Sequence, residues 1–264
     1  MRKDFKYTKA LLITLLAIAT VFLVGVTPLF SISDISVSGN KYYSDSHIIE
    51  KSGLRAGQNG FSALLSKNII KMLSLRCANA EQAVAAACPY VKSVQARYAP
   101  PRAISIEIEE RGKSVIVPYF GSGLLIDGEG VVVDIVGNYR ESELPVALGI
   151  SIKRYEVGKT LSVEDESSVG SLLLIVNAIR QADRDGGGNL SWKVDSINVS
   201  DPRNLTLGIN NGISVNLGDG TELYYRVSAA KEIMAHGVNE GEKGVIMFTN
   251  GARPVFIPDT GPAA

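Results

Sequence analysis

An uncharged run at residues 10–30 constrains this 264-residue chain more than any other feature. At about 1.5 Å of rise per residue, a helix of this length crosses the roughly 30 Å hydrocarbon core of a membrane. We therefore expect a single transmembrane helix over residues 10–30. A cleaved secretory signal is the competing interpretation. It is disfavoured because the run is longer than the usual apolar segment of a signal and no small-x-small cleavage site follows Phe30.

The charges on either side of this run predict its orientation. Four basic residues and one acidic residue precede it, and the first charge after it is Asp34. Because the positive flank of a membrane helix stays in the cytoplasm, residues 1–9 are expected to form a cytoplasmic tail. The remaining chain is then extracytoplasmic, with 23 basic and 26 acidic residues beyond position 30. This mildly acidic balance argues against a nucleic-acid partner.

The two cysteines, Cys77 and Cys88, flank a stretch of small residues at 78–87. A disulfide between them is expected, because the compartment can be oxidising and closing so short a loop contributes about 3 kcal/mol in the chain-entropy model. Two buried free thiols are the alternative. The chain has two histidines, too few and too scattered to complete a zinc site, so no metal or cofactor is predicted.

Apolar periodicity divides residues 31–110 into five elements. Strand signals cover residues 31–38, 94–98 and 104–108, and helix signals cover residues 45–51 and 61–73. The stripe of Phe61, Leu65, Ile69 and Met72/Leu73 on the second helix is interpreted as core packing. The order strand, helix, helix, strand, strand predicts a small sheet covered on one side by two helices, in a domain over residues 31–110.

Residues 111–258 show a different pattern, with short strands and two helices. Strand signals occur at residues 115–117, 123–126, 131–135, 192–199, 205–209, 213–217, 245–248 and 255–257. The helix signals are Val169, Leu172, Leu173, Val176 and Ile179, then Leu223, Val227, Ala230 and Met234. We predict an α+β domain with a mostly antiparallel sheet, followed by a flexible tail at residues 259–264.

Several short motifs follow one another in a fixed order behind the uncharged run. They are ISVSGN at 35–40, SGLRAG at 52–57, VKSV at 91–94, YAPP at 98–101, ISIEIEER at 104–111, LIDxxG at 125–130 and LPxxxG at 144–149. In this order the chain resembles the bacterial division proteins FtsQ and DivIB across nearly its whole length. The resemblance implies a membrane helix, a POTRA domain of βααββ order and an FtsQ-type β domain. One departure is residues 245–248, where family members often carry an acidic residue.

The resemblance also implies a non-enzymatic scaffold of the cell envelope at the division septum. Its partners would be FtsB/DivIC-like and FtsL-like membrane proteins, through which it helps to control septal peptidoglycan synthesis. The partner segment is expected to add as a strand beside the last strands of the chain. The candidate contact residues are Val245, Met247, Phe248, Gly251, Val255 and Phe256. Phe248 and Phe256 are the expected anchors, and closure of the domain core is the alternative role for both rings.

One motif of catalytic type occurs in the chain. Ser228 and Lys231 form an S-x-x-K pair, but no K-T-G follows it and the S-x-N candidates precede it. No catalytic residue is therefore predicted. The alternative function is an envelope sensor or ligand-binding ectodomain, which needs a concave apolar pocket with convergent polar groups.

Overall fold

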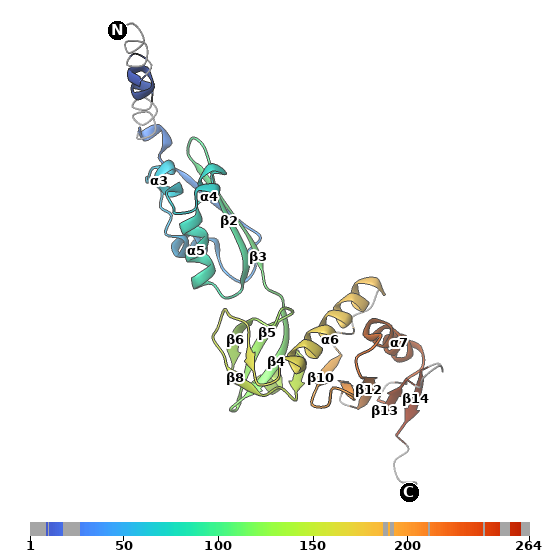
Figure 1. Cartoon of the computed structure of the whole chain (residues 1–264). Helices are drawn as coiled ribbons and strands as arrows, with labels where there is room; N and C mark the ends of the chain where they lie inside the picture. Colours follow the sequence, from blue (N-terminus) through green and yellow to red (C-terminus); the bar gives the residue numbers. More distant parts are fainter. Residues whose placement is uncertain are drawn as a thin grey trace. The chain divides into compact units, whose positions relative to one another are not determined.

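The computed structural model describes residues 9, 11–17, 27–186, 190, 193–210, 212–239, 241–248 and 254–259. It divides into two units, Met1–Arg111 and Gly112–Ala264 (Figure 1). Of the expected membrane span, residues 11–17 are helical, whereas residues 10 and 18–26 lie outside the described part. Within the described part, no helix is both long enough and apolar enough to cross a membrane.

The first unit is a three-stranded sheet covered by helices, as expected. Its strands are β1 (Asp34–Ser38), β2 (Val91–Ala99) and β3 (Ala103–Glu110), in the order β1-β3-β2. β3 runs parallel to β1 and antiparallel to β2. The helices are η1 (Pro28–Phe30), α2 (Asp45–Ser52), α3 (Gly60–Leu64), α4 (Ile69–Leu73) and α5 (Ala78–Ala87). Figure 1 shows α5 lying along the sheet. The predicted alternation is confirmed, because Ile104, Ile106 and Ile108 are all buried.

Gly39, the glycine of the ISVSGN motif, lies close to the backbone of β3. Gly39 has a φ of +85°, and a Cβ atom there would overlap the carbonyl oxygen of Ile108. The loop that follows is held by Glu110, whose carboxylate accepts the backbone N–H groups of Lys41, Tyr42 and Tyr43. The Glu110 side chain therefore has a structural role at the end of β3.

The helix expected over residues 61–73 is wrong in extent and in burial. It is two short helices, α3 and α4, separated at residues 65–68. The Asn68 side chain accepts the N–H of Lys71, and the Ser66 hydroxyl accepts the N–H of Asn68, so polar side chains compete with helical bonding here. The apolar stripe is exposed rather than packed in the core. Phe61, Leu65, Ile69 and Leu73 are exposed, and Met72 is the member that packs partly against the core.

The second covering helix is α5, which occupies the stretch expected to be a loop between the two cysteines. Cys77 is the N-cap and Cys88 the C-cap of this alanine-rich helix. Eleven residues of helical rise hold their Cα atoms about 16 Å apart, whereas a disulfide requires less than about 7 Å. The structure accordingly has two free, buried thiols and not the expected disulfide.

A buried carboxylate ties α4, α5 and β2 together. Glu81 on α5 is 3% exposed and pairs with Lys71 at 2.6 Å and Arg76 at 2.7 Å. It also accepts the backbone N–H of Ala96 on β2 at 3.1 Å. Burial alone would raise the pKa of Glu81, but the hydrogen bonds from Arg76, Lys71 and Ala96 outweigh it and lower that pKa.

The second unit is built on a nine-stranded sheet. Its order is β14-β13-β12-β11-β10-β7-β4-β5-β6, and β8 and β9 form a separate pair. The strands of this unit are β4 (Lys113–Tyr119), β5 (Ser122–Asp127), β6 (Val132–Val136), β7 (Val146–Leu148), β8 (Ile152–Arg154), β9 (Ser162–Val163), β10 (Val194–Asn198), β11 (Leu205–Ile209), β12 (Ile213–Gly218), β13 (Gly244–Met247) and β14 (Val255–Pro258). A short helix, η2 (Tyr139–Glu141), precedes β7.

The two long helices make the sheet less antiparallel than expected. α6 (Glu166–Asp185) lies in the connection between the parallel neighbours β7 and β10, and α7 (Leu223–His236) connects the parallel neighbours β12 and β13. Parallel neighbours need such crossover connections. The helix stripes themselves are confirmed. The buried members are Val169, Leu172, Val176 and Ile179 on α6 and Leu223, Val227 and Ala230 on α7.

We predict that Cys77 and Cys88 resist modification in the folded chain. Burial, then the nearby Glu81 carboxylate, raises the pKa of Cys77 to about 11, and burial also raises the pKa of Cys88. Both groups are thus neutral thiols at pH 7 and shielded from solvent. Alkylation followed by mass spectrometry should find both unmodified in native protein and both modified in denaturant. A mass two hydrogens lower, restored by a reductant, would contradict this prediction.

Glu81→Gln should lower the stability of the first unit by about 2–3 kcal/mol at pH 7. This is slightly below the range for breaking a fully buried pair, because Lys71 and Arg76 are partly exposed. The folded pKa of Glu81 is below its ordinary value of 4.5, so its contribution is complete above that value and is lost as the pH falls. The difference between wild type and variant should therefore shrink in acid.

The two cysteines make this prediction measurable in the full chain, since both lie in the first unit. Their rate of reaction with a disulfide reagent that works at acid pH reports opening of that unit alone. Glu107→Gln, which removes an exposed carboxylate from β3, is the matched control and should change little. A Glu81→Gln effect that is independent of pH would contradict the assigned ion pairs.

Candidate functional site

β14 is one edge of the nine-stranded sheet, so its outer side has no neighbouring strand among the described residues. It pairs with β13 in an antiparallel register that matches Val245 with Ile257 and Met247 with Val255. The opposite edge, β6, is partly covered. The N–H of Val132 donates to the carbonyl of Lys159, and the N–H of Gly158 donates to the carbonyl of Val132. β14 is therefore the more open of the two edges.

The backbone direction along β14 follows from two hydrogen bonds. The N–H of Asp259 donates to the carbonyl of Lys243 at 2.8 Å, and the N–H of Gly244 donates to the carbonyl of Gly212, on the β12 side, at 3.1 Å. Successive residues of a strand direct their backbone groups to opposite sides. The backbone of Phe256 therefore faces outward from the sheet edge.

Two prolines direct their backbone groups outward from the sheet edge, as Phe256 does. Pro254 and Pro258 lie two residues before it and two residues after it. Because proline has no N–H group, Phe256 supplies the one outward amide within residues 254–258. Its own carbonyl and those of the two prolines supply the outward acceptors. The carbonyl groups of an added strand can thus accept a hydrogen bond from this edge at a single position, the N–H of Phe256.

The outer face of the same strand pair is apolar. Val245, Met247, Val255 and Ile257 are 37%, 42%, 56% and 49% exposed. These four residues, here called the edge cluster, are paired across β13 and β14 and point to one side of the sheet. Three of them were predicted from the sequence. Ile257 was missed, although it follows Val255 at the period of two that defines a strand face.

The two expected aromatic anchors have a different orientation from that predicted. Phe256 is opposite the fully buried Ile246, and its ring packs against the domain core. Gly244 makes room for it, since a Cβ atom there would lie 2.7 Å from the ring. Phe248 also packs against the core, with the Arg226 guanidinium 5.6 Å from its ring centroid. The rings therefore have the core-closing role that was the alternative. The sixth predicted residue, Gly251, lies outside the described residues.

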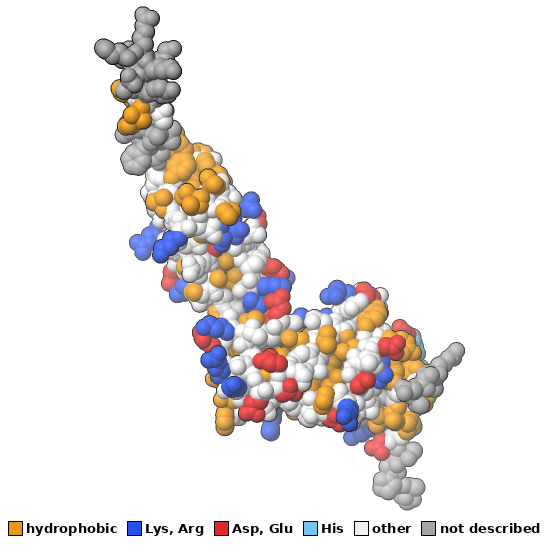
Figure 2. Space-filling model, in the orientation of Figure 1, with side chains coloured by type: hydrophobic (Ala, Val, Ile, Leu, Met, Phe, Trp, Pro, Cys, Tyr) orange, Lys and Arg blue, Asp and Glu red, His pale blue; other side chains and the backbone are white. Residues whose placement is uncertain are grey.

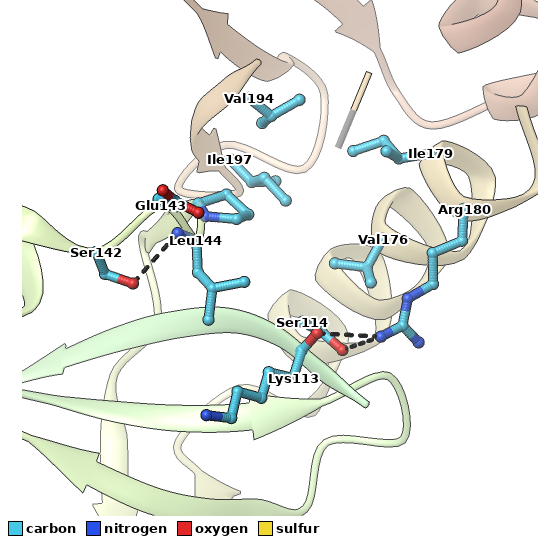
Figure 3. Close-up of a pocket in the computed structure, with 11 residues that line it drawn as sticks. Lys113, Ser114, Ser142, Glu143, Leu144, Val176, Ile179, Arg180, Val194 and Ile197 are labelled. Atoms are coloured by element: carbon cyan, nitrogen blue, oxygen red, sulfur yellow. Dashed lines mark hydrogen bonds between the residues drawn. The ribbon is translucent and has the colours of Figure 1, made fainter. Parts of the chain in front are cut away.

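A separate feature is a cavity of about 420 Å³ between α6, strands β4 and β10, and residues 142–145, which precede β7 (Figure 3). Its walls are mainly aliphatic, with Leu144, Val176 and Ile197 among the lining residues. Its most prominent cation, Arg180, donates to the Ser114 hydroxyl at 2.5 Å and to the backbone carbonyls of Gly112 and Lys113. The guanidinium thus joins α6 to β4 rather than converging with other polar groups on the cavity.

The lysine of the S-x-x-K pair is also held by structural contacts. Lys231 on α7 donates to the carbonyl of Ala182 at 2.8 Å and pairs with Asp183 at 3.3 Å. Both acceptors belong to the last turn of α6, where a cation interacts favourably with the helix dipole. Lys231 therefore links the two long helices of the second unit.

The architecture defines a class of protein: a POTRA domain followed by a β-rich domain with one open edge. A family model described as "POTRA domain, FtsQ-type" matches residues 30–111. A relative from Clostridium acetobutylicum, "Cell division protein DivIB", is 26% identical over 235 residues, covering 87% of this chain and 83% of that protein. The domain match and the relative together support the resemblance to the FtsQ/DivIB family that the ordered motifs indicated.

Gly244→Ala should loosen β14 from β13. The added methyl group would overlap the carbonyl oxygen of Ile257 as well as the Phe256 ring, and a backbone atom can give way only if the strands separate. Overpacking of this kind costs about 1–3 kcal/mol. Hydrogen exchange should rise at the amides of β14 while β11 stays protected.

Gly170→Ala on the exposed side of α6 is the matched control for that substitution. Its Cβ atom would meet open space, and alanine is the better helix former. This variant should keep the exchange of β14 unchanged. Equal exchange of β14 in the Gly244→Ala variant and the wild type would contradict the close packing at the edge.

Proposed function

We propose that this protein is a non-enzymatic scaffold of the bacterial division machinery, anchored in the cell membrane and acting at the septum. The single observation that carries the proposal is the open β14 edge, with its one outward amide and its apolar outer face. Strand addition to such an edge is a recurrent mode of peptide recognition. The match to an FtsQ-type POTRA domain and the similarity to a DivIB protein support the division role.

The membrane part of the proposal depends on residues 10–30. The uncharged run is long enough to span a bilayer, and the basic residues before it favour a cytoplasmic N-terminus. The POTRA domain and the β-rich domain that follows it would then be extracytoplasmic. In that location they can meet the exposed parts of other single-pass membrane proteins.

The chemistry of the edge specifies the partner segment. The edge cluster would pack against apolar side chains at alternate positions of an added strand. The outward N–H of Phe256 would donate to one carbonyl of that strand, which restricts its register. FtsB/DivIC-like and FtsL-like proteins are the partners that the family resemblance implies, and through them the chain would influence septal peptidoglycan synthesis.

The rival function, a ligand-binding ectodomain, needs an apolar cavity with convergent polar groups, and the cavity beside α6 has the apolar walls. Arg180 and Ser114 at that cavity already bind each other, so the polar groups needed to orient a ligand do not converge there. The edge is therefore the better supported site.

Comparing Phe256→Pro with Phe256→Ala tests strand addition. Both variants lose the ring and hence the same core packing, but only proline removes the outward N–H. Since that amide faces away from β13, its loss leaves the β13–β14 hydrogen bonds in place. We expect the proline variant to bind the extracytoplasmic segment of a DivIC-like partner about tenfold more weakly than the alanine variant, the equivalent of one hydrogen bond.

The measurement is the dissociation constant of purified full-length chain, with melting temperature recorded for each variant. Ile257→Pro is a folding control, because its N–H faces β13 and its loss should disturb the pair itself. Equal partner affinity in the Phe256→Pro and Phe256→Ala variants would reject strand addition at this edge. Failure of wild-type chain to co-purify with any small single-pass protein would reject the scaffold.

A further inference from the structure

An apolar surface on the POTRA domain is not explained by its fold. Six large apolar side chains on η1, α3, α4 and their connection are solvent-exposed, from 38% for Phe61 to 81% for Ile70. They are Leu29, Phe61, Leu65, Ile69, Ile70 and Leu73, here called the apolar cap. Figure 2 shows hydrophobic side chains gathered over the end of the domain that carries α3 and α4. Exposed apolar patches of this kind mark binding surfaces.

Contacts fix the apolar cap beside the point where the chain leaves the uncharged run. The ring of Phe30, the last residue of that run, lies 5.0 Å from the ring of Phe61. The N–H of Ile32 donates to the carbonyl of Gln58, just before α3. η1 and α3 therefore move as one body with the first residues after the run.

Tyr98 joins α4 to the same end of the domain. Its ring packs against Gly60 and Phe61, and its N–H donates to the carbonyl of Leu75, just after α4. Its hydroxyl donates to the carbonyl of Pro101 at the tip of the β2–β3 hairpin. The other end of β3, at Glu110, lies about 25 Å away at the rise of an eight-residue strand.

The charge of this surface favours a lipid bilayer as its occupant. Residues 60–76 contain Lys67, Lys71 and Arg76 and no acidic residue. Lys71 and Arg76 share the single carboxylate of Glu81, and Lys67 is exposed, so the surface keeps a positive balance. Apolar side chains combined with basic ones are typical of segments that lie in a membrane interface containing anionic lipid. A surface connected directly to a membrane helix also meets that interface without any additional partner.

We infer that the apolar cap docks into the headgroup region of the membrane that holds the anchor, so that the POTRA domain is seated on the bilayer. This inference rests on the proposed membrane anchor. Seating would hold the domain in a defined orientation, with the Glu110 end directed away from the lipid. The long apolar side chains of α4 would enter the interface, and the flanking lysines would contact anionic headgroups.

The test uses full-length chain reconstituted in vesicles of phosphatidylethanolamine and phosphatidylglycerol. An Ile70→Cys variant is labelled with an environment-sensitive fluorophore, and Lys41→Cys, at the Glu110 end, is the matched control. Both native thiols are fully buried, which directs labelling to the introduced cysteine. Quenching by lipids that carry a bromine or nitroxide group should be severalfold greater for the Ile70 label. Replacing phosphatidylglycerol with phosphatidylcholine should reduce that difference.

Two outcomes would overturn the inference. Equal and weak quenching at both positions would show that the cap remains in water and is covered by something other than lipid. Equal and strong quenching would show that the whole domain lies on the membrane without a preferred face. Vesicle flotation separates these results from failure of the anchor, because chain that does not float with the vesicles rejects the proposed membrane anchor itself.

Discussion

The burial of Tyr98 is the interaction on which the first unit depends most. Its side chain is 2% exposed, and it brings together the chain leaving the uncharged run, the start of α3 and the tip of the β2–β3 hairpin. Only glycine fits at position 60, because a Cβ atom there would overlap the tyrosine ring. These contacts hold the start of the domain rigidly against the residues that follow the uncharged run.

Period-two and helical periodicities predicted the fold well wherever one face of an element meets a large apolar surface. β3 and α6 are such elements, and their predicted residues are buried except Leu173, which is partly buried. The same rule failed at residues 61–73, where Asn68 begins a new helix and the apolar side chains face solvent. Periodicity reports that apolar residues share a face. It does not report whether protein, lipid or another chain covers that face.

The candidate site was predictable as an edge but not in its side-chain directions. Position at the end of the chain indicated the edge, and the apolar composition of residues 245–248 and 255–257 indicated strands. Which side chains point outward depends on the pairing of Ile246 with Phe256 and on the space left by Gly244. Those are long-range properties of register, so aromatic size alone selected the wrong anchors. The disulfide expectation failed for a related reason, because the alanine-rich stretch forms a helix that separates its ends.

The two prolines at the β14 edge limit self-association, which is a risk for every open edge that binds a partner strand. An open edge with an apolar face is a template for self-association as well as for a partner. Pro254 and Pro258 have no N–H groups, so the edge lacks donors on either side of Phe256. A strand from a second copy of the chain could therefore accept only one hydrogen bond from this edge. A partner can compensate through side chains that pack on the edge cluster, whereas nonspecific pairing depends mainly on backbone bonds. The arrangement therefore favours recognition by side chains over indiscriminate extension of the sheet.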